Sequence, residues 1–561
     1  MTIEKKRLLI VGGVAGGASC AARARRLSET AEIIILERGA FVSFANCGLP
    51  YYVGDVITEE KKLLVANAEL FKQRFNIEVR LENEVIDIKP DAAEITIRNL
   101  TTGKIYREPY DALVLAPGAA PIRPPIPGID LPGIFAIRNI PDSRRIRQWI
   151  ETHQVKKAVV VGGGFIGLEM TENLVHRGIE VTLIEGQDQV MPPLDPEMVV
   201  AVHQRLQEQG VRLELNNLVT GFSAQDSDRL TVSTKLGTNY EADLVILGMG
   251  VRPETTLAQA AGLKLGDRGG IQVNPQMQTS DPKIWAVGDA VEVPNFITQD
   301  SELLALAGPA NRQGRIAADA IFGRESQFRG VQGTSVCGMF DLTIASTGVN
   351  EKTLQKLGWQ YNKVYLHPGH HVGYYPNAKA ISIKLLYSTV DGQILGAQAV
   401  GEAGVEKRID VIATAIQMKA TVFDLEEAEL CYAPQFGAAK DPVNMAGMIA
   451  ANALRGDAPL VHWTKLGNIN GELLLDVRES HEFEAERVLN AVNIPLSQLR
   501  QRMQELPKDK PLWVYCRVGQ RAYYATRALR LDGFEAYNLS GGFKTYEAIN
   551  SLKPTKIAVT L

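Results

Sequence analysis

This chain of 561 residues has only five cysteines, and no two of them show CxxC or metal-type spacing. That scarcity argues against a disulfide framework and against a structural metal site. No apolar run reaches the roughly 18 residues that a membrane-spanning helix needs. The formal net charge of -4 provides no broad cationic surface for nucleic acid or for an anionic membrane. We therefore expect a protein without metal ligands that binds neither nucleic acid nor membranes.

The N-terminal residues run directly into a strand-like segment and lack the apolar core of a signal peptide. A cytoplasmic location is the expectation. With 45% hydrophobic and 22% charged residues, the composition is that of an ordinary globular protein. A chain of this length is too long for a single hydrophobic core, so several domains are predicted.

The clearest pattern is a glycine-rich turn between an apolar strand and a helix, and it occurs twice, 150 residues apart. In the second copy, Gly162, Gly164 and Gly167 complete the GxGxxG dinucleotide fingerprint. Glu185 ends the following strand, where its carboxylate would accept hydrogen bonds from a ribose 2′-hydroxyl and repel a 2′-phosphate. This copy therefore predicts a nicotinamide site that favours NADH, with NADPH still possible.

The first copy departs from the fingerprint, because Val14 occupies the middle position between Gly12 and Gly17. A turn without a ligand is one interpretation. The segment 279–289 argues otherwise, since its Gly-Asp ending resembles the second FAD motif of two-dinucleotide flavoproteins. That resemblance implies that Asp289 binds the ribityl chain and that Glu37 holds the adenosine ribose of FAD.

Cys47 lies just downstream of the first dinucleotide unit, in the segment Ser-Phe-Ala-Asn-Cys-Gly-Leu-Pro-Tyr-Tyr at 43–52. Residues 1–450 resemble a pyridine nucleotide-disulfide oxidoreductase of the subgroup with a single redox cysteine. Where other members complete a CxxxxC pair, this chain has Tyr52. Cys47 is therefore expected to act alone, as a thiolate stabilised by the flavin and by N–H groups at a helix start.

The turn at 12–17 and the segment around Cys47 together resemble coenzyme A-disulfide reductase. In that family two tyrosines from the partner subunit of a homodimer reach the active site, and here the matching residues are Tyr374, with Tyr375 as a substitute, and Tyr432. The alternative interpretation is that these tyrosines are packed aromatic residues at a dimer interface. Coenzyme A would be substrate or bound ligand, and the resemblance places five further residues along it: Arg23, Arg26, Ser43, Asn46 and Lys440. The two arginines could equally be solvated residues on a helix.

A second reactive cysteine, Cys516, opens the loop Cys-Arg-Val-Gly-Gln-Arg between an apolar strand and a helix predicted from Ala522. A six-residue loop of this kind curls backbone N–H groups around the sulfur, and the helix N-terminus, Arg517 and Arg521 add positive charge. Phosphatase loops commonly close one residue later, which favours sulfur chemistry here. Residues 461–561 resemble a rhodanese domain, which implies that Cys516 carries sulfane sulfur with Arg521 beside it.

The fold class we predict is α/β, with two Rossmann-like dinucleotide-binding domains, an α+β dimerisation domain and a C-terminal α/β rhodanese domain. The expected boundaries are as follows: 1–120 and 248–328 for the FAD-binding domain, 121–247 for the NAD(P)H-binding domain, 329–450 for the dimerisation domain, 451–460 for a linker and 461–561 for the rhodanese domain.

The leading functional hypothesis is an NADH-driven flavoenzyme that reduces persulfides, polysulfides or coenzyme A disulfides through Cys47, with Cys516 supplying the sulfur. Such an enzyme would resemble an NADH-dependent persulfide reductase. One alternative is an NADH oxidase or peroxidase in which Cys47 cycles through sulfenic acid. A non-catalytic redox or sulfide sensor is the other. The sequence leaves the preferred sulfur substrate open, and also the direction of sulfur flow and whether the two thiols exchange sulfur directly.

Overall fold

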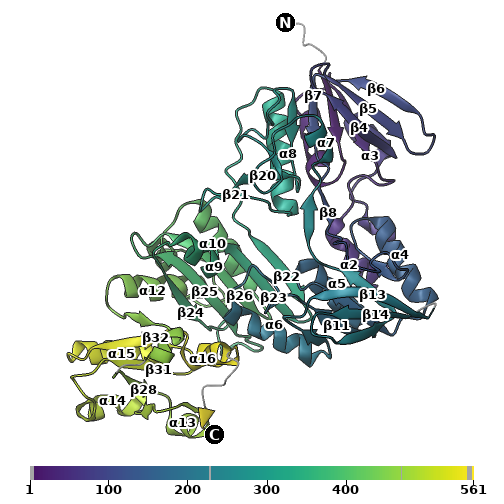
Figure 1. Ribbon diagram of the computed structural model, residues 1–561. Coiled ribbons are helices and arrows are strands. Elements are labelled where there is room, and N and C mark those ends of the chain that lie inside the picture. The colour runs from purple at the N-terminus through teal and green to yellow at the C-terminus, as the bar shows by residue number, and fades with distance from the viewer. Residues whose placement is uncertain (1–5, 227–228, 469–470, 553–558, 561) are drawn as a thin grey trace. The chain divides into compact units, whose positions relative to one another are not determined.

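The computed structural model describes residues 6–226, 229–468, 471–552 and 559–560 (Figure 1). The chain forms two compact units: Met1–Asp188 with Gly210–Val331, and Gln189–Gln209 with Gln332–Leu561. No helix within the described ranges combines the length and the apolarity needed to cross a bilayer.

The first unit contains two parallel five-stranded sheets of similar construction. Strand order is β19-β7-β1-β2-β3 in one sheet and β12-β11-β10-β16-β9 in the other. In each sheet a helix connects the central strand to its parallel neighbour, β1 to β2 in the first and β10 to β11 in the second. The first sheet consists of β1 (Arg7–Val11), β2 (Glu32–Glu37), β3 (Glu78–Leu81), β7 (Ala112–Leu115) and β19 (Ile284–Ala286). The second consists of β9 (Ile134–Phe135), β10 (Lys157–Val161), β11 (Glu180–Ile184), β12 (Arg212–Glu214) and β16 (Leu244–Leu247).

The central strands are almost continuously apolar, as sheets covered on both faces require. The crossover helices are α1 (Ala15–Arg25) in the first sheet and α5 (Phe165–His176) in the second. Helix α8 (Ala307–Ile321) lies against α1, and a Cβ atom on Gly314 would stand only 2.2 Å from the Gly16 carbonyl oxygen. Small residues on both helices therefore permit this close packing.

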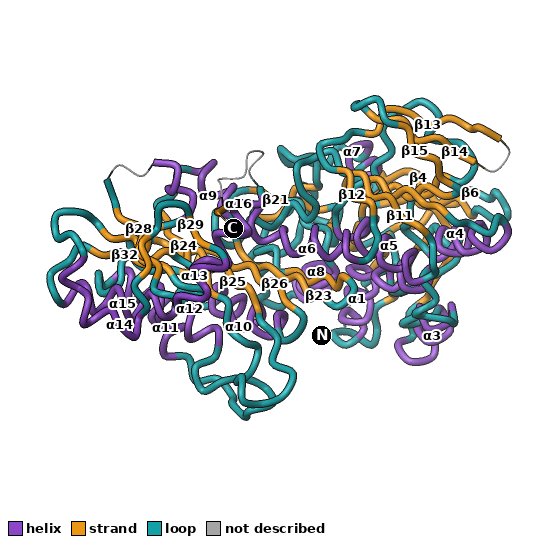
Figure 2. Tube along the Cα trace, turned by 90° about the horizontal axis from the view of Figure 1, so that it is seen from below, coloured by secondary structure: helices purple, strands orange, loops and turns teal. Residues whose placement is uncertain are grey.

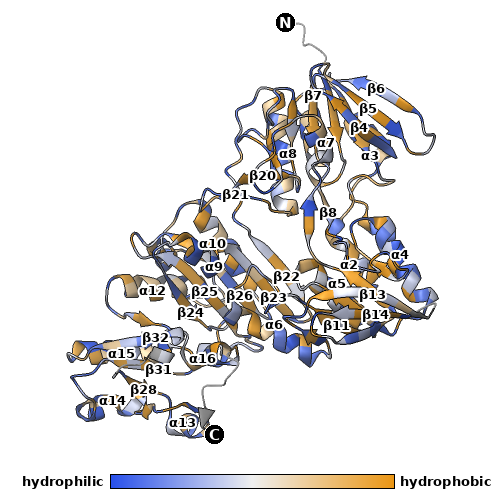
Figure 3. Cartoon of the chain, in the orientation of Figure 1, coloured by the Kyte–Doolittle hydropathy of each residue, from blue (hydrophilic) through white to orange (hydrophobic). Residues whose placement is uncertain are grey.

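The second unit begins with an antiparallel sheet of order β22-β23-β26-β25-β24. Its strands are β22 (Ser335–Met339), β23 (Leu342–Gly348), β24 (Tyr361–Leu366), β25 (Ile381–Ser388) and β26 (Ile394–Gly401). Its helices are α9 (Glu351–Leu357), α10 (Val405–Gln417), α11 (Val422–Glu427) and α12 (Pro442–Leu454). The apolar residues of β25 and β26 contrast with the largely hydrophilic surface of helix α4 (Ile140–Thr152) in the first unit (Figure 3).

The C-terminal part of this unit is a parallel sheet of order β27-β32-β31-β28-β30. Its elements are β27 (Leu460–Val461), β28 (Leu473–Asp476), β30 (Val492–Asn493), β31 (Leu512–Tyr515), β32 (Ala536–Leu539), α13 (Ser480–Ala485), α14 (Leu496–Arg502), α15 (Gln520–Leu531) and α16 (Gly542–Ser551). Side chains of β31 alternate, with Leu512 and Val514 in the core under α14 and α15 and Trp513 and Tyr515 in the core under α16. Figure 2 shows α14 and α15 beside β28 and β32.

Helix α6 (Pro196–Glu208) packs in the second unit, although it lies inside the segment that the sequence assigns to the nicotinamide domain. The cause is a buried cation. The Lys384 ammonium lies 2.7 Å from Asp195, 2.5 Å from Glu197 and 2.7 Å from Glu351. Burial on its own would raise the pKa of Glu351, but Lys384 and Lys363 lower it to about 2. The three carboxylates, which cluster closely enough to hold a metal ion, are thus neutralised by lysine.

The predicted fold class is confirmed by this architecture, and two local predictions need correction. The sulfur loop is shorter than six residues, since α15 begins at Gln520. Arg521 therefore belongs to the first turn of α15. Residues 451–454 of the predicted linker continue helix α12.

We expect Lys384→Met to destabilise the second unit by about 3–5 kcal/mol, because the buried Asp195 and the largely buried Glu197 and Glu351 would lose their shared cation. The measurement is the denaturant midpoint at pH 7, together with hydrogen exchange in α6 and β25. Lys379→Met is the matched control, since Lys379 makes an exposed pair with Glu402 that is worth about 1 kcal/mol or less. Equal effects of the two substitutions would contradict a structural role for the cluster.

Candidate functional site

The two glycine-rich turns have the same backbone geometry. A Cβ atom at Gly17 would stand 1.9 Å from the Gly12 carbonyl oxygen, and one at Gly167 would stand 1.9 Å from that of Gly162. Gly12 and Gly162 have φ values of +94° and +104°, which a side chain would disfavour. Each turn thus brings its helix N-terminus close to the end of its strand, the arrangement that receives a dinucleotide pyrophosphate.

The two predicted ribose-binding glutamates hold these turns in place. Glu37 accepts hydrogen bonds from the N–H groups of Gly13, at 2.9 Å, and of Gly39, at 2.8 Å. Glu185 accepts equivalent bonds from Gly163, at 2.6 Å, and Gln187, at 2.8 Å. Both carboxylates therefore stand at the mouth of a turn.

The middle positions of the two turns differ. No atom lies within 4 Å of the Cβ position of Gly164, so this turn is open for a ligand to approach. Val14, at the equivalent point of the first turn, is the N-cap of α1.

Asp289 is fixed in the first unit by its own turn. The Gly288 N–H group donates to the Gln313 side chain at 2.7 Å, which orients the turn at the start of the Asp289 peptide. Burial raises the pKa of Asp289, and the positive charge of Arg138 opposes that shift. A partly buried carboxylate with an arginine charge acting on it suits the hydroxyl groups of a ribityl chain, so Glu37, Asp289 and the Gly12 turn fit FAD.

Cys47 lies in a short 3-10 turn, Asn46–Gly48, that leads directly into α2 (Leu49–Val53). It is exposed, and it has no cysteine partner among the described residues. Burial of the sulfur raises the pKa of the Cys47 thiol, as do the charges of Glu169 and Asp289, while its own backbone N–H group lowers it. A backbone N–H group thus stabilises the Cys47 thiolate as expected, but burial and the two carboxylates act against it.

Glu169 is a residue that the sequence analysis missed. It projects from the first turns of α5, the helix that follows the nicotinamide fingerprint, and the Tyr51 hydroxyl donates to it at 3.4 Å. Burial raises the pKa of Glu169 to about 7. A carboxyl group that titrates near neutral pH beside a reactive thiol is a common feature of catalytic sites. Its position two residues after Gly167 was visible in the sequence, but its proximity to Cys47 was not.

Ser43, predicted along the substrate, has an unusual backbone conformation with φ at +48°. Its N–H group donates to the Gly13 carbonyl, and its own carbonyl accepts from Val65 and Ala66. These bonds tie the Cys47 segment to the first glycine turn.

The predicted cationic residues divide into two kinds. Arg23 is largely buried and bound to Asp319 of α8 at 2.6 Å, so its charge is already paired. Arg26 is exposed at the end of α1, and Lys440 is exposed in the second unit. Arg26 is therefore the better candidate of the two arginines for a phosphate group.

The structure brings the two predicted tyrosines together. The hydroxyl groups of Tyr374 and Tyr432 lie 2.8 Å apart, and the side chains are exposed (75% and 45%). The hydrogen bond with Tyr374 raises the pKa of Tyr432, which keeps that phenol protonated. Tyr375 instead stands edge-on to the His371 ring.

Cys516 is almost fully buried at the end of β31. The Gly519 N–H group donates to its sulfur at 3.2 Å. The carbonyl groups of Cys516 and Arg517 face away and accept from the N–H groups of Phe543, at 2.7 Å, and Lys544, at 3.0 Å. With these two carbonyl groups held outward, the Gly519 N–H group faces the sulfur, an arrangement that suits a bound sulfur anion such as a persulfide.

Arg521 contacts a partner that the sequence analysis did not identify. Its guanidinium forms two hydrogen bonds with Glu482, at 2.6 and 2.9 Å, and these lower the pKa of Glu482 to about 2. Arg521 also interacts with the Cys516 sulfur. The bidentate pair thus orients the cation at the sulfur loop.

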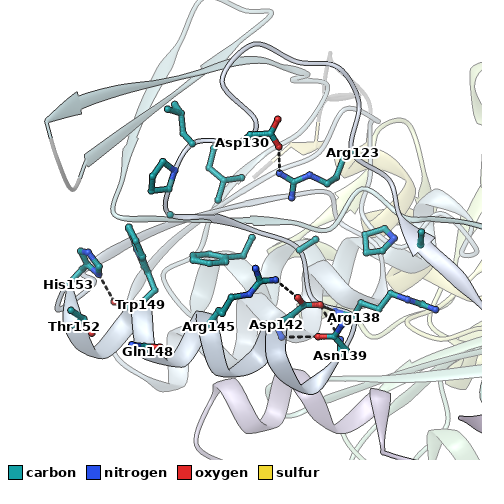
Figure 4. Close-up of a pocket in the computed structure, with 18 of the residues that line it drawn as sticks. Arg123, Asp130, Arg138, Asn139, Asp142, Arg145, Gln148, Trp149, Thr152 and His153 are labelled. Carbon is teal, nitrogen blue, oxygen red and sulfur yellow. Dashed lines mark hydrogen bonds and ion pairs between the residues drawn. The ribbon is translucent and has the colours of Figure 1, made fainter. Parts of the chain in front are cut away.

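A separate cavity of about 760 Å³ in the first unit runs along α4, from Arg38 and Arg138 to the stacked rings of Trp149 and His153 (Figure 4). None of the predicted site residues lines it. Arg123 pairs with Asp130 and Arg145 pairs with Asp142, so the positive charges of these two cavity-lining arginines are balanced by neighbouring carboxylates.

Family models match three parts of the chain. Residues 6–314 match the pyridine nucleotide-disulphide oxidoreductase family, 334–441 its dimerisation domain and 461–549 the rhodanese-like domain. A curated coenzyme A disulfide reductase of Staphylococcus haemolyticus is 36% identical over 443 residues, covering 79% of this chain and 98% of that protein.

Solved structures show the same relationship. Reduced Bacillus anthracis CoADR-RHD is 48% identical, with a TM-score of 0.95 and 98% of each chain covered. An NAD-dependent persulfide reductase from A. fulgidus is 36% identical, with a TM-score of 0.89, covering 96% of this chain and all (100%) of that one. The water-forming NADH oxidase from Lactobacillus brevis is 27% identical, with a TM-score of 0.76, over 80% of this chain and 99% of that one.

Two dinucleotide-binding turns and an exposed thiol without a cysteine partner among the described residues define an oxidoreductase that passes electrons from a nicotinamide to sulfur. The chain belongs to the pyridine nucleotide-disulphide oxidoreductase family and carries a C-terminal rhodanese-like domain. The family uses FAD and NAD(P)H. When bound, FAD supplies the two-electron relay between the nicotinamide and the thiol.

Replacing Glu169 with Gln should speed alkylation of Cys47 above pH 7 and leave it unchanged well below pH 7. Glu169, whose pKa is about 7, is protonated in acid, so the two proteins then carry the same charge there. Above pH 7 only the native carboxylate opposes the thiolate, and its removal should raise the rate by about 3–10-fold. The measurement is the iodoacetamide rate at Cys47 by mass spectrometry from pH 5.5 to 9.

Glu180→Gln, at an exposed position on β11 of the same unit, is the control for that comparison. Superimposable profiles for the native protein and Glu169→Gln would show that Glu169 does not act on Cys47.

Proposed function

We propose that this protein is an NADH-driven, FAD-dependent reductase of persulfides, polysulfides and coenzyme A disulfides, and that Cys516 supplies it with sulfane sulfur. The observation that carries the proposal is the sulfur loop, in which the Gly519 N–H group points at a buried thiol in a chain that also holds a single exposed redox cysteine. The relatives named as a coenzyme A disulfide reductase and as a persulfide reductase support both halves of the proposal.

The reaction at Cys47 balances without a second protein thiol. The Cys47 thiolate attacks the outer sulfur of a persulfide R–S–SH, giving Cys47–S–SH and the leaving thiolate R–S⁻, which is then protonated. Two electrons that originate from NADH cleave the new S–S bond, which regenerates the Cys47 thiolate and releases hydrosulfide. With a disulfide R–S–S–R, the same attack gives a mixed disulfide and the same two electrons release the second thiolate. Glu169, which titrates near pH 7, sets the charge beside the attacking thiol in both cases.

Proton supply to the leaving thiolate is the role we assign to Tyr374 and Tyr432. Their exposed, mutually bonded phenols suit a site that the partner subunit completes. The match to a dimerisation domain supports a homodimer in which this pair reaches the neighbouring Cys47 site. Arg26, Ser43, Asn46 and Lys440 would then lie along coenzyme A.

Rhodanese chemistry begins at Cys516. Its thiolate takes the outer sulfur of a donor such as thiosulfate, releases sulfite, and holds the persulfide anion among the loop N–H groups and Arg521. A second thiol then removes that sulfur. A coenzyme A thiol would leave as CoA–S–SH, the form that Cys47 reduces, so its pantetheine arm would carry sulfur from one site to the other.

An NADH oxidase is the second candidate, favoured by the similarity to the Lactobacillus brevis enzyme over 80% of the chain. That candidate assigns no role to the complete sulfur loop. Anaerobic NADH oxidation with CoA persulfide, compared with oxygen and peroxide as acceptors, separates the two.

Substitution of the two cysteines should separate the two activities. Cys516→Ser should lower thiosulfate sulfurtransferase activity by about 100-fold or more and keep NADH oxidation with free CoA persulfide within about 2-fold, because only the thiol nucleophile of one site is lost. Cys47→Ser should do the reverse. Cys337→Ala, at a cysteine on β22 that neither proposed site includes, is the control. Equal loss of both activities in Cys516→Ser would contradict the division of labour.

Glu185 should determine the choice between NADH and NADPH. The native protein should show a higher kcat/KM with NADH, because the carboxylate at the ribose position repels a 2′-phosphate. The double substitution Glu185→Ser with Gln187→Arg should lower the ratio of kcat/KM with NADH to kcat/KM with NADPH by roughly tenfold, which corresponds to about 1.4 kcal/mol. Initial rates with the two nucleotides measure it, and an unchanged ratio would place nicotinamide selectivity elsewhere.

A further inference from the structure

The sulfur loop depends on the first turn of α16. Helix N-termini carry N–H groups without intrahelical partners, and here two of them, at Phe543 and Lys544, hold the carbonyl groups of Cys516 and Arg517 outward. The approach is close, since a Cβ atom on Gly542 would stand 2.4 Å from the Cys516 carbonyl oxygen. Any displacement of this turn would rotate the loop peptides and turn their N–H groups away from the sulfur.

That turn is bound on its other side by the antiparallel sheet of the same unit. Strand β24 is an edge strand, so alternate backbone N–H groups lack a strand partner. The N–H group of Tyr365 donates instead to the buried Ser540 hydroxyl at 3.0 Å. Gly541, which follows Ser540, lies directly against the Cβ atom of Tyr365 and against the Thr545 side chain.

His367, just beyond the end of β24, makes the second contact. Its Nε2 lies 2.8 Å from the Thr545 hydroxyl oxygen, and its Nδ1 lies 3.0 Å from that of Ser382. Burial and the charges of Lys544 and Arg517 lower the pKa of His367 to about 3, so the ring is neutral at physiological pH. A neutral imidazole has one donor and one acceptor nitrogen, so it can donate a hydrogen bond to one hydroxyl group and accept one from the other.

We propose that His367, a residue of the dimerisation sheet, is a positioning residue for sulfur transfer at Cys516, acting through Thr545 and the first turn of α16. The chain of contacts is continuous, from Ser382 and His367 to Thr545, and from the same helical turn to the carbonyl groups of Cys516 and Arg517. The dimerisation sheet is thus part of the sulfurtransferase site, although it contributes no atom that touches sulfur. This inference rests on the proposed role of Cys516 as sulfur carrier.

A second buried histidine provides a matched control. His462 also joins the two parts of the unit, with its Nε2 2.8 Å from the Asn362 side chain. Its pKa is likewise lowered to about 3 by burial. It lies next to β27, and within the described part of the chain its hydrogen bond goes to Asn362 rather than to the α16 turn. Substituting it tests general docking of the C-terminal sheet without disturbing the support of the sulfur loop.

The experiment compares four full-length, flavin-loaded variants with the native protein: His367→Leu, Thr545→Val, Thr545→Ser and His462→Leu. The first readout is the pH profile of Cys516 alkylation by iodoacetamide, which requires no sulfur donor. His367→Leu and Thr545→Val should shift its midpoint upward by about one pH unit, as expected for the loss of one hydrogen bond to a thiolate. Thr545→Ser, which keeps the hydroxyl group, and His462→Leu should match the native profile.

The second readout is thiocyanate formation from thiosulfate and cyanide. In this assay His367→Leu and Thr545→Val should lose about tenfold in kcat with little change in KM, because a tenfold loss corresponds to a shift of one pH unit in the thiolate midpoint. Unshifted alkylation in Thr545→Val, or an equal shift in His462→Leu, would overturn the positioning role. If the native protein transfers no sulfur, the proposed function fails at Cys516, while the alkylation profiles still decide whether His367 positions the loop. Thr545→Val keeps the side-chain volume and so covers the case in which His367→Leu does not fold.

Discussion

Close approach of one backbone segment to another is the constraint on which the reactive parts of this protein depend. It occurs at three strand-to-helix turns, where a Cβ atom would stand 1.9 Å from a carbonyl oxygen at Gly17 and Gly167 and 2.4 Å at Gly542. In the first two, the contact brings a helix N-terminus to the position of a dinucleotide phosphate. In the third, it holds carbonyl groups away from a sulfur. The N–H groups at the first two turns are thus left for phosphate, whereas those at the third bind carbonyl groups and leave the Gly519 N–H group to face the sulfur.

The two thiols lie in opposite electrostatic settings, which fits different chemical duties. Cys516 faces the Gly519 N–H group and the Arg521 cation, the surroundings that the proposed sulfur carrier needs in order to hold a persulfide anion. At Cys47, burial and then the charges of two carboxylates raise the pKa of the thiol. A thiolate of raised pKa is a stronger base and a stronger nucleophile when it forms. Protonation of Glu169, whose pKa is about 7, removes one of the charges that oppose this thiolate.

Much of this organisation could be predicted from the sequence, because local patterns encode it. The duplicated glycine turns, the acidic strand ends and the cysteine loop are short-range signals, and their strands and helices lie where the sequence places them. Long-range pairings left no such signal. Glu169 approaches Cys47, Glu482 binds Arg521 and Lys384 recruits α6 only because the fold brings distant segments together. Conversely, Arg23 looked like a free cation until the packing of α1 on α8 paired it with Asp319.

The contacts inside the second unit also bear on how sulfur moves. The C-terminal sheet is fixed to the dimerisation sheet through Ser540, Thr545 and His462, each bonded to a residue of β24 or its immediate extension. Helix α16 also packs against α6, so the attachment is broader than these hydrogen bonds. Swinging of the C-terminal domain on its linker would break these contacts and with them the support of the Cys516 loop. Under the proposed function, sulfur would therefore leave Cys516 on a thiol carrier with a flexible arm, and the pantetheine chain of coenzyme A has that chemistry.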